Sequence, residues 1–223
     1  MFSEGEIRAA ACAEGLAKKG RNRLAALLSG STLALLSWRL FPFTFGEFSS
    51  GLLVGFFYAN GFEYAFHRVV LHWHRGFFAQ QHLRHHSTWL APDQARYVSF
   101  ARTPWAVATL FIVNAIPVGL AEWVFHLGWA SGMFVIFTLY YVAFEEIHWR
   151  IHVSGWLPPW LRLAARHHLL HHAGAEERFN IFLPVFDWLL GTGIGSQVKH
   201  ERRPISGPCL QQGRPHQRER RER

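Results

Sequence analysis

The chain has 223 residues, enough for one substantial domain and too few for a catalytic domain joined to a complete electron-transfer domain. Half of its residues are hydrophobic, with 20 Phe and 10 Trp, yet its mean hydropathy is only +0.03. Long apolar segments must therefore alternate with polar ones, as in a membrane protein with soluble ends. The formal charge of +8 does not indicate a nucleic-acid-binding protein, because much of it lies in the segment 199–223, which has little to bury.

Both ends of the chain are basic. Residues 1–23 carry a cluster of Lys and Arg ahead of an apolar run, with no convincing cleavage site after them. They are interpreted as a basic cytosolic N-terminal segment that leads into a retained anchor. Residues 199–223 contain one Lys and seven Arg against three Glu, which predicts a disordered basic C-terminal tail. Such a tail either lies near an anionic lipid leaflet or serves only solubility.

Four apolar segments approach the roughly 20 residues that a helix needs to cross a bilayer. The first is interrupted by Arg39, and the last two are so close in sequence that they must form a hairpin. The four predicted spans cover residues 24–45, 51–66, 104–125 and 127–144.

The distribution of Lys and Arg predicts the orientation of these spans. Neither residue type occurs between Leu40 and His67 or between Thr103 and Trp149. The positive-inside rule therefore places both termini and both histidine-rich blocks in the cytosol. The predicted fold is all-α, an integral membrane helical bundle of about four transmembrane helices with a cytosolic, histidine-rich helical cap.

Two shorter segments follow the fourth predicted span. LRLAARHHLLHH comes after a Pro-Pro break and is predicted to be a helix at the membrane interface. FNIFLPVFDWLLG is too short, and too broken by Pro184, for a predicted span. It is interpreted as a re-entrant or interfacial segment, or as part of the core.

Histidine is the residue type that points to chemistry, with 15 copies in the chain. Positions i, i+3 and i+4 share one face of an α-helix, so each HxxHH or HxxxH block is expected to aim its imidazoles at one point. The pair in HRVVLH is about 140° apart on an ideal helix, and either flanks a metal pair or sits across a helix end. The four clusters are HRVVLH (His67, His72), HLRHH (His82, His85, His86), HWRIH (His148, His152) and HHLLHH (His168, His171, His172).

All four clusters fall on the predicted cytosolic side, so one site at the membrane edge can collect them. Ten imidazoles exceed the needs of one ion and predict two ions with about five ligands each. Imidazole binds iron, zinc, copper and nickel, so the ligand type alone does not choose the metal. His74, His167 and His200 adjoin the pattern without fitting it, and the isolated His126 and His216 are excluded.

Carboxylates are expected near such a site, because neutral imidazoles leave the charge of the ions unbalanced. They would bridge the ions or hydrogen-bond to their ligands. Glu145 is favoured because it lies one helical turn before His148. The candidates are Glu63, Asp93, Glu145, Glu146 and Asp187.

The four clusters, together with HLRHHSTWLAPD and FNIFLPVFDWLLGT, resemble the fatty acid hydroxylase superfamily, which includes sterol desaturases, fatty acid 2-hydroxylases and carotenoid hydroxylases. The resemblance runs from about Glu63 to Thr192. It implies a membrane hydroxylase domain, here residues 24–198, with two iron ions and O2 as co-substrate. Zinc can occupy such sites in purified protein. The implied metal ligands are His67, His72, His82, His85, His86, His148, His152, His168, His171 and His172.

The spacing of the clusters looks more like the lipid hydroxylase branch than the carotenoid branch, where the third histidine box is usually wider. That box lacks the commoner Tyr-Asp lead-in and has Phe144, Glu145 and Glu146 instead, which affects the substrate assignment. Neither an HPGG haem motif nor GxGxxG is present, so a separate ferredoxin, cytochrome or reductase is expected to supply electrons.

The function expected from the sequence is hydroxylation of a lipid, either fatty acyl, sterol or related, at the cytoplasmic face of a bacterial inner membrane or the endoplasmic reticulum. The alternatives are a carotenoid hydroxylase or lipid desaturase with the same centre, a bis-histidine haem protein, a metal-scavenging or pH-responsive surface, and a membrane metal-binding or transport protein. Transport would place ionisable groups through the spans. The centres of the third and fourth predicted spans are apolar apart from Asn114 and Thr138.

Overall fold

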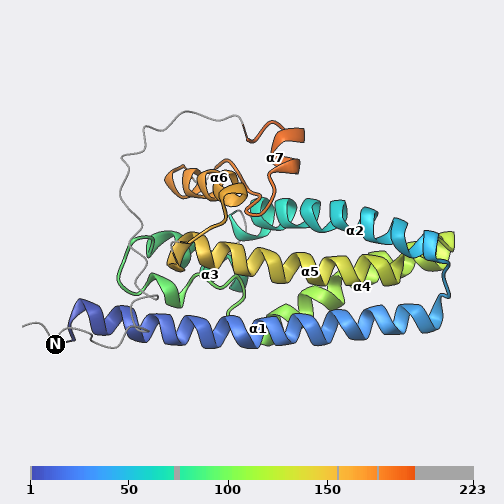
Figure 1. Ribbon diagram of the computed structural model, residues 1–223, viewed down its shortest axis with the longest axis horizontal. Coiled ribbons are helices and arrows are strands. Elements are labelled where there is room, and N and C mark those ends of the chain that lie inside the picture. Colours follow the sequence, from blue (N-terminus) through green and yellow to red (C-terminus); the bar gives the residue numbers. More distant parts are fainter. Residues whose placement is uncertain (1, 73–75, 155, 175, 194–223) are drawn as a thin grey trace, which may run out of the picture.

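The structure is a computed structural model that describes residues 2–72, 76–154, 156–174 and 176–193. These residues contain helices and no strands, which confirms the predicted all-α class (Figure 1). The elements are α1 (Glu4–Leu40), α2 (Phe45–Ala65), η1 (Phe66–Leu71), α3 (Phe77–Ser87), η2 (Gln94–Arg96), α4 (Pro104–Phe125), α5 (Ala130–Trp149), η3 (Arg150–Ser154), η4 (Pro159–Leu161), α6 (Arg162–Ala173) and α7 (Val185–Leu189).

Four long helices form the bundle, in which α5 packs against both α1 and α2 while α1 also packs against α4. Glycines allow α2 and α5 to approach closely. A Cβ on Gly51 would lie 2.3 Å from the carbonyl oxygen of Trp129, and one on Gly132 would lie 2.4 Å from that of Phe48. The short helices α3 and α6 lie toward the end of the bundle where α1 begins, and α7 lies beside α2 (Figure 1).

Local signals in the sequence account for the helix ends. Ser3 and Thr44 each form a capping box at the start of α1 and α2. The hairpin between α4 and α5 is closed by the buried carboxylate of Glu122, which accepts hydrogen bonds from the backbone N–H groups of Gly128, Trp129 and Ala130 at 2.7, 2.9 and 3.0 Å. One side chain therefore satisfies three N–H groups at the start of α5.

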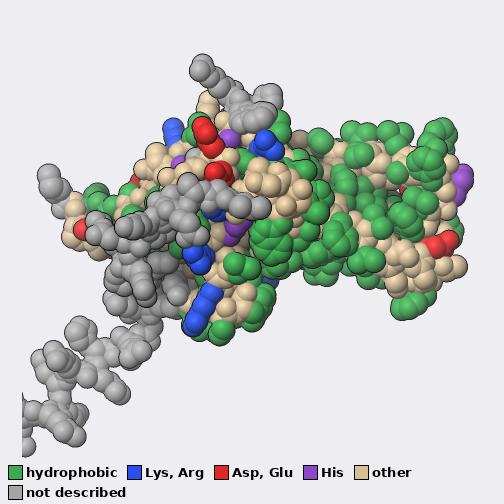
Figure 2. Space-filling model, turned by 90° about the horizontal axis from the view of Figure 1, so that it is seen from above, with side chains coloured by type: hydrophobic (Ala, Val, Ile, Leu, Met, Phe, Trp, Pro, Cys, Tyr) green, Lys and Arg blue, Asp and Glu red, His purple; other side chains and the backbone are tan. Residues whose placement is uncertain are grey.

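Two helices are long and apolar enough to cross a membrane, Pro104–Phe125 and Ala130–Val153. The outer face of α4 exposes large apolar side chains such as Ile112, Ile116 and Leu120. On the face shown in Figure 2, hydrophobic side chains cover most of one half of the molecule, whereas Lys, Arg and most of the acidic and histidine side chains lie on the other half. A surface of this kind is suited to lipid rather than to water.

The structure differs from several predicted boundaries. Residues 24–40 of the first predicted span, 24–45, form the second half of one continuous helix that begins at Glu4 and ends at Leu40, just before Pro42. The last residue of that predicted span, Phe45, already belongs to α2. Neither α1 nor α2 matches α4 and α5 in apolar character, so among the described residues two helices, not four, qualify as spans by composition. The proposed tail, 199–223, lies outside the described residues.

The segment after α6 is mostly irregular, and its described residues form neither a span nor a re-entrant helix. Only Val185–Leu189 is helical in it, as α7, which packs on α2. Pro184 directly precedes this short helix, and the Phe186 ring lies over Gly61, where a Cβ would come within 2.8 Å of it. Phe179, Asn180 and Ile181 are nevertheless buried, and Ile181 belongs to the main hydrophobic core. The segment is therefore part of the core, one of the alternatives expected from the sequence.

Candidate metal centre

The first histidine pair lies where α2 widens into the π-helix η1. A π-helix hydrogen-bonds from residue i to i+5, so residues five apart follow one another on one face. His67 lies inside η1 and His72 is its C-cap, with their ring centroids 5.1 Å apart. The pair therefore occupies a helix end, and the alternative in which it flanks two metals is wrong. The two rings point to one place because the helix changes from α to π geometry between them and α2.

The ten histidines predicted as ligands gather into two groups of five. Within each group, one ring nitrogen from every side chain lies within 4.8 Å of the others. Cluster A consists of His67, His72, His82, His86 and His171, and cluster B consists of His85, His148, His152, His168 and His172.

Each HxxHH block supplies both clusters, so the expectation that such a block aims at one point is wrong. In α3, His82 and His86 join cluster A, whereas His85 joins cluster B. Residues i+3 and i+4 differ by about 100° around the helix axis, which is enough to separate two neighbouring sites. In α6 the division is reversed, and His171 alone joins cluster A. The clusters adjoin where the His86 and His172 rings stack 4.2 Å apart.

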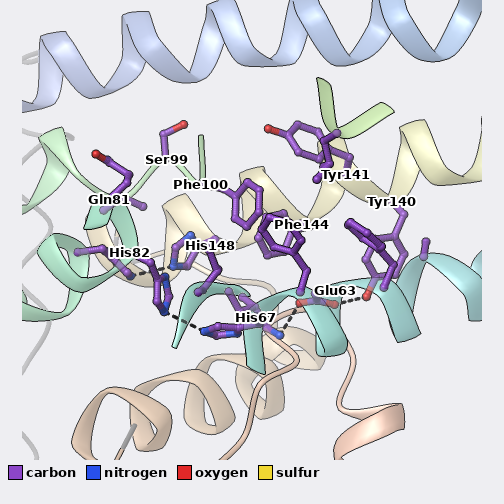
Figure 3. Close-up of a pocket in the computed structure, with 18 of the residues that line it drawn as sticks. Glu63, His67, Gln81, His82, Ser99, Phe100, Tyr140, Tyr141, Phe144 and His148 are labelled. Carbon is purple, nitrogen blue, oxygen red and sulfur yellow. Dashed lines mark hydrogen bonds between the residues drawn. The ribbon is translucent and has the colours of Figure 1, made fainter. Parts of the chain in front are cut away.

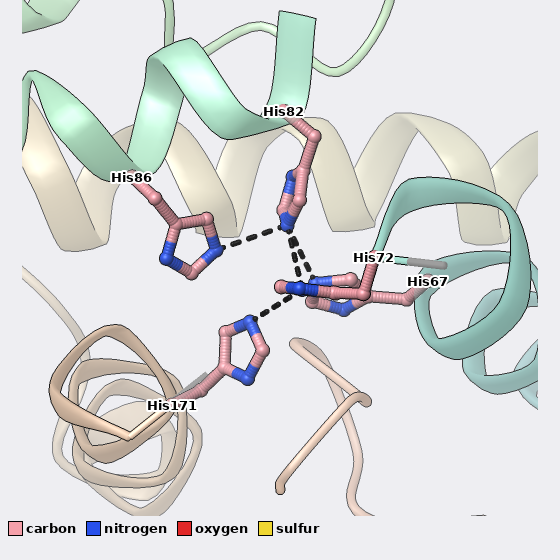
Figure 4. A group of neighbouring side chains, drawn as sticks. All are labelled: His67, His72, His82, His86 and His171. Atoms are coloured by element: carbon pink, nitrogen blue, oxygen red, sulfur yellow. Dashed lines mark hydrogen bonds between the residues drawn. The ribbon is translucent and has the colours of Figure 1, made fainter. Parts of the chain in front are cut away.

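Cluster A is centred on His82 (Figure 4). The Nε2 atom of His82 lies 3.0 Å from the Nε2 atoms of His67, His72 and His86. The Nε2 atoms of His72 and His171 are 3.2 Å apart. Five ring nitrogens supplied by three separate helical segments thus converge on one small volume.

These contacts fit a bound cation better than hydrogen bonds. An imidazole nitrogen carries either one N–H or one lone pair, so His82 Nε2 cannot hydrogen-bond to three other ring nitrogens. Nitrogens bound at 2.0–2.1 Å to one ion and 90° apart would lie about 3.0 Å from each other. The spacing around His82 has this value, and the donor set suits a transition metal.

Cluster B has similar spacing. The Nε2 atoms of His148 and His85 are 3.1 Å apart. His168 Nε2 lies 2.8 Å from His152 Nε2 and 3.1 Å from His172 Nε2. The side chain of His168 is fully buried. Cluster B can therefore hold a second ion by the same argument.

Backbone carbonyls orient two ligands of cluster A. The Nδ1 atom of His67 contacts the carbonyl oxygen of Phe179, and that of His171 lies 2.6 Å from the carbonyl oxygen of Glu177. A carbonyl only accepts hydrogen bonds, so Nδ1 carries the proton in each ring. The lone pair of Nε2 is then free to face the cluster, as in many metal-binding histidines.

Burial keeps these imidazoles neutral. Loss of solvation lowers the pKa of the half-buried His72 and His86 to about 4. The same cause lowers the pKa far below the ordinary value of 6.5 in the more deeply buried His67, His82, His85, His168 and His171. Neutral rings at pH 7 have the lone pair that metal binding requires.

The favoured carboxylate does not contact the ligands as expected. Glu145 is buried, but it accepts hydrogen bonds from Ser99 Oγ at 3.0 Å and from the backbone N–H of Phe100 at 2.9 Å. Its direction on α5 points it toward the segment before α4 rather than toward His148. The expectation that Glu145 binds or orients a ligand is therefore wrong, and the carboxylate anchors a loop.

The other acidic candidates are also engaged elsewhere. Glu63 and Asp187 accept backbone N–H groups of residues 179–182. Glu146 forms ion pairs of 2.7 Å with both Lys19 and Arg150. Asp93 precedes η2 without capping it through its side chain. None of these contacts joins a carboxylate directly to a histidine of cluster A or B.

The remaining histidines stay apart from the clusters. His167 is buried and pairs with Asp187 at 2.9 Å, although it adjoins His168 in sequence. His126 is the exposed C-cap of α4, at the hairpin with α5. His74, His200 and His216 lie outside the described residues.

A largely apolar pocket adjoins both clusters (Figure 3). His67 and His82 of cluster A and His85 and His148 of cluster B contribute to its wall. The rest of the lining comes mainly from α2, α4, α5 and the segment 97–100, and is rich in Phe. Sequence reasoning did not foresee the aromatic part of this lining, because aromatic side chains resemble ordinary span packing. Besides His67, His82 and His148, the figure labels the lining residues Glu63, Gln81, Ser99, Phe100, Tyr140, Tyr141 and Phe144.

Comparisons with known proteins agree with this geometry. The family model described as fatty acid hydroxylase matches residues 52–192, which contain all ten histidines of the two clusters. The chain is also similar to a solved structure described as full-length Scs7p with only the hydroxylase domain visible, at 23% identity and a TM-score of 0.55. That match covers 78% of this chain and 66% of the other, and shows a shared fold. No curated protein matches this sequence.

The matched region extends over more than half of the chain, from α2 to the residues just after α7. It contains the pocket wall of α2, α4 and α5 as well as both clusters. The chain belongs to the fatty acid hydroxylase family.

Proposed function

We propose that this chain is a membrane-bound lipid hydroxylase that uses O2 and two iron ions, one held by each histidine cluster. The observation that carries the proposal is the position of the apolar pocket, whose wall includes imidazoles of both clusters. A C–H bond of a lipid in that pocket would lie beside both ions. Imidazole suits iron and also zinc, which purification could leave in the same sites.

The pocket supports an apolar substrate. Phe62, Phe66 and Phe137 line it, together with Ala59 and Leu110. These side chains offer an acyl chain or a ring system contacts without hydrogen-bonding demands. Apolar walls also exclude water, which protects reactive species formed during an oxidation. We therefore propose a fatty acyl, sterol or related lipid as the substrate.

The residues of the chain have separate tasks in this reaction. The bound iron would supply the reaction with O2 that oxidises an unactivated C–H bond. The ten imidazoles would hold the ions in their buried clusters, and the backbone carbonyls of Phe179 and Glu177 fix two of the rings. The aromatic walls beside His148, including Phe100 and Phe144, would orient the lipid.

The distribution of charge supports a membrane location with the metal end in the cytosol. The exposed Arg84 and Arg166 lie on the two helices that carry the HxxHH blocks, while α4 exposes apolar side chains. Basic residues favour the cytosolic side of a membrane. We propose that α1 and α2 accompany α4 and α5 in the bilayer, and that a separate ferredoxin, cytochrome or reductase supplies electrons from the cytosolic side.

Comparative lipid mass spectrometry tests the proposed reaction. Cells that produce the native chain should contain a lipid one oxygen heavier than its precursor, and cells with His171→Ala should lack it. A loss of two hydrogens would instead indicate a desaturase with the same centre. Identical lipid extracts from the two strains, with both proteins present in the membrane, would contradict an oxygenase.

A further inference from the structure

An irregular segment that follows α6 borders cluster A. We call residues 176–184 the strap. Its two carbonyl oxygens on Glu177 and Phe179 hold the Nδ1 atoms of His171 and His67. These histidines come from α6 and from the end of α2, so the strap joins the two halves of cluster A.

Asp187 fixes the strap from the side of α7. This fully buried carboxylate accepts the backbone N–H groups of Phe179 at 2.9 Å and Asn180 at 2.7 Å. The hydroxyl of Thr192 donates to it at 2.7 Å. The Phe179 N–H bonded to Asp187 and the Phe179 carbonyl bonded to His67 belong to the same residue. A shift of Asp187 therefore moves the acceptor that orients a cluster A ligand.

Glu63 fixes the strap from the side of α2. It accepts the backbone N–H groups of Ile181 at 2.6 Å and Phe182 at 3.3 Å, and the side-chain amide of Asn180 at 3.2 Å. Glu63 lies one helical turn before His67. The two carboxylates thus hold four consecutive backbone N–H groups, from 179 to 182, between them.

Among the described residues, no hydrogen bond runs from the strap to a histidine of cluster B. The Nδ1 atoms of His168 and His172 are buried and have no hydrogen-bond partner among the described residues. His148 is hydrogen-bonded to the backbone of Val98, in the loop before α4 and not in the strap. The hydrogen bonds of the strap to cluster ligands go to His67 and His171, both in cluster A.

We infer that Asp187 and Glu63 are positioning residues for the metal ion of cluster A. The strap then stabilises the metal site of cluster A and not that of cluster B. The inference rests on the proposed metal sites. Hydrogen-bond partners of metal ligands commonly change metal affinity by about 10–100-fold when they are lost. Asp187 acts on His67 one step further out, through the backbone of Phe179. We expect Asp187→Ala to weaken metal binding in cluster A within this range while cluster B keeps its ion.

The test is metal retention by the full-length protein in detergent after dialysis against a graded chelator. The native protein should retain two ions per chain. Asp187→Ala should lose one of its two ions at a chelator concentration about 10–100-fold below the one at which the native protein loses its first ion. Equal retention by the variant and the native protein would overturn the inference, and so would parallel loss of both ions. A native protein that binds fewer than two ions would contradict the proposed function instead.

Two control variants separate positioning from general damage. Glu122→Ala removes a buried carboxylate that also accepts backbone N–H groups, but in the α4–α5 hairpin. It should lower thermal stability and leave two ions. His167→Ala removes the contact between α6 and Asp187 and leaves the strap bonds in place, so it should also retain two ions. Loss of one ion from either control would overturn the assignment to the strap.

A double-variant experiment identifies which ion is lost. His72→Ala removes a ligand of cluster A, and His172→Ala removes one of cluster B. Adding Asp187→Ala to His72→Ala should cause no further loss, because the same ion is already gone. Adding it to His172→Ala should leave no ion at the same chelator concentration. The reverse pattern would place the effect of Asp187 on cluster B and overturn the inference.

Discussion

The two ends of the bundle both bury polar side chains but use them differently. In the apolar half, Asn114 accepts a hydrogen bond from Tyr58 at 2.6 Å, and Thr138 donates to the carbonyl of Phe134 at 2.6 Å. In the histidine half, the Nε2 atoms of ten rings face one another in two groups. Hydrogen-bonded buried groups stabilise a fold, whereas converging lone pairs require a ligand. The contrast separates polar groups that build the structure from those that bind metal.

The largest expected effect is the loss of a central ligand. His168→Ala should abolish lipid oxidation, by at least about 100-fold, because cluster B loses a fully buried donor that contacts two other ligands. Product formation in membranes and metal content measure the effect. His126→Asn is the matched control, since His126 is exposed and Asn tolerates its left-handed backbone. Equal losses in the two variants would contradict the distinction between clustered and isolated histidines.

The outer surface of the apolar half gives the next effect. Ile116 is 59% exposed on α4. Ile116→Arg should disfavour membrane insertion by about 2.5–3.5 kcal/mol if this position lies near the bilayer centre. The measurement is the fraction of protein recovered in washed membranes, with Ile116→Leu as the control. An arginine variant that inserts as well as the native chain would show that this face of α4 does not contact lipid.

Glu145 is a buried polar residue of the histidine half that belongs to neither cluster. Glu145→Ala should cost about 1–3 kcal/mol of stability, because the buried Ser99 hydroxyl and Phe100 N–H lose their acceptor. Metal content should stay native, since Glu145 bonds to Ser99 and Phe100 and not to Val98, the residue whose backbone contacts His148. Thermal unfolding in detergent and metal analysis measure the two quantities separately. Loss of an ion at unchanged stability would restore the role in metal binding expected from the sequence.

The smallest effect is the response of the metal-free protein to pH. The pKa of His72 and His86 is about 4 in the folded chain, against 6.5 for a free side chain. Below pH 6.5 the unfolded chain binds more protons than the folded one, so stability should fall as the pH drops from 6.5 toward 4. The unfolding temperature at pH 7.5 and 5.5 tests this. The double variant with His72→Asn and His86→Asn is the comparison. A steeper fall of its unfolding temperature than of the native chain's would contradict the prediction.

Sequence patterns predicted which histidines gather but not how they divide into two clusters. Repeated HxxHH and HxxxH spacing identified the ten side chains that the structure gathers. The division into clusters depends on the relative placement of α3 and α6 and on the π-helix at His67, which are set by tertiary packing. The carbonyls of Glu177 and Phe179 were not foreseen either, because every residue has a carbonyl and no side chain marks the one that is used.

Sequence also predicted the helical class and the two most apolar helices. Segments 104–125 and 127–144 correspond to α4 and the first part of α5. The sequence did not reveal that one continuous helix crosses the predicted boundary at residue 23. A basic segment and an apolar run differ in composition, although both favour α-helix. Glu145 was misjudged because one-turn spacing to His148 specifies the helix face but not what the neighbouring loop at Ser99 offers.

The most direct test of the account is the iron content of the purified chain after anaerobic reconstitution, combined with its absorption spectrum. The account predicts two iron ions per native chain, no Soret band, and fewer than two ions in His168→Ala. A native chain that binds one ion or none, or that shows a haem spectrum, would contradict two histidine-ligated metal sites beside the lipid pocket.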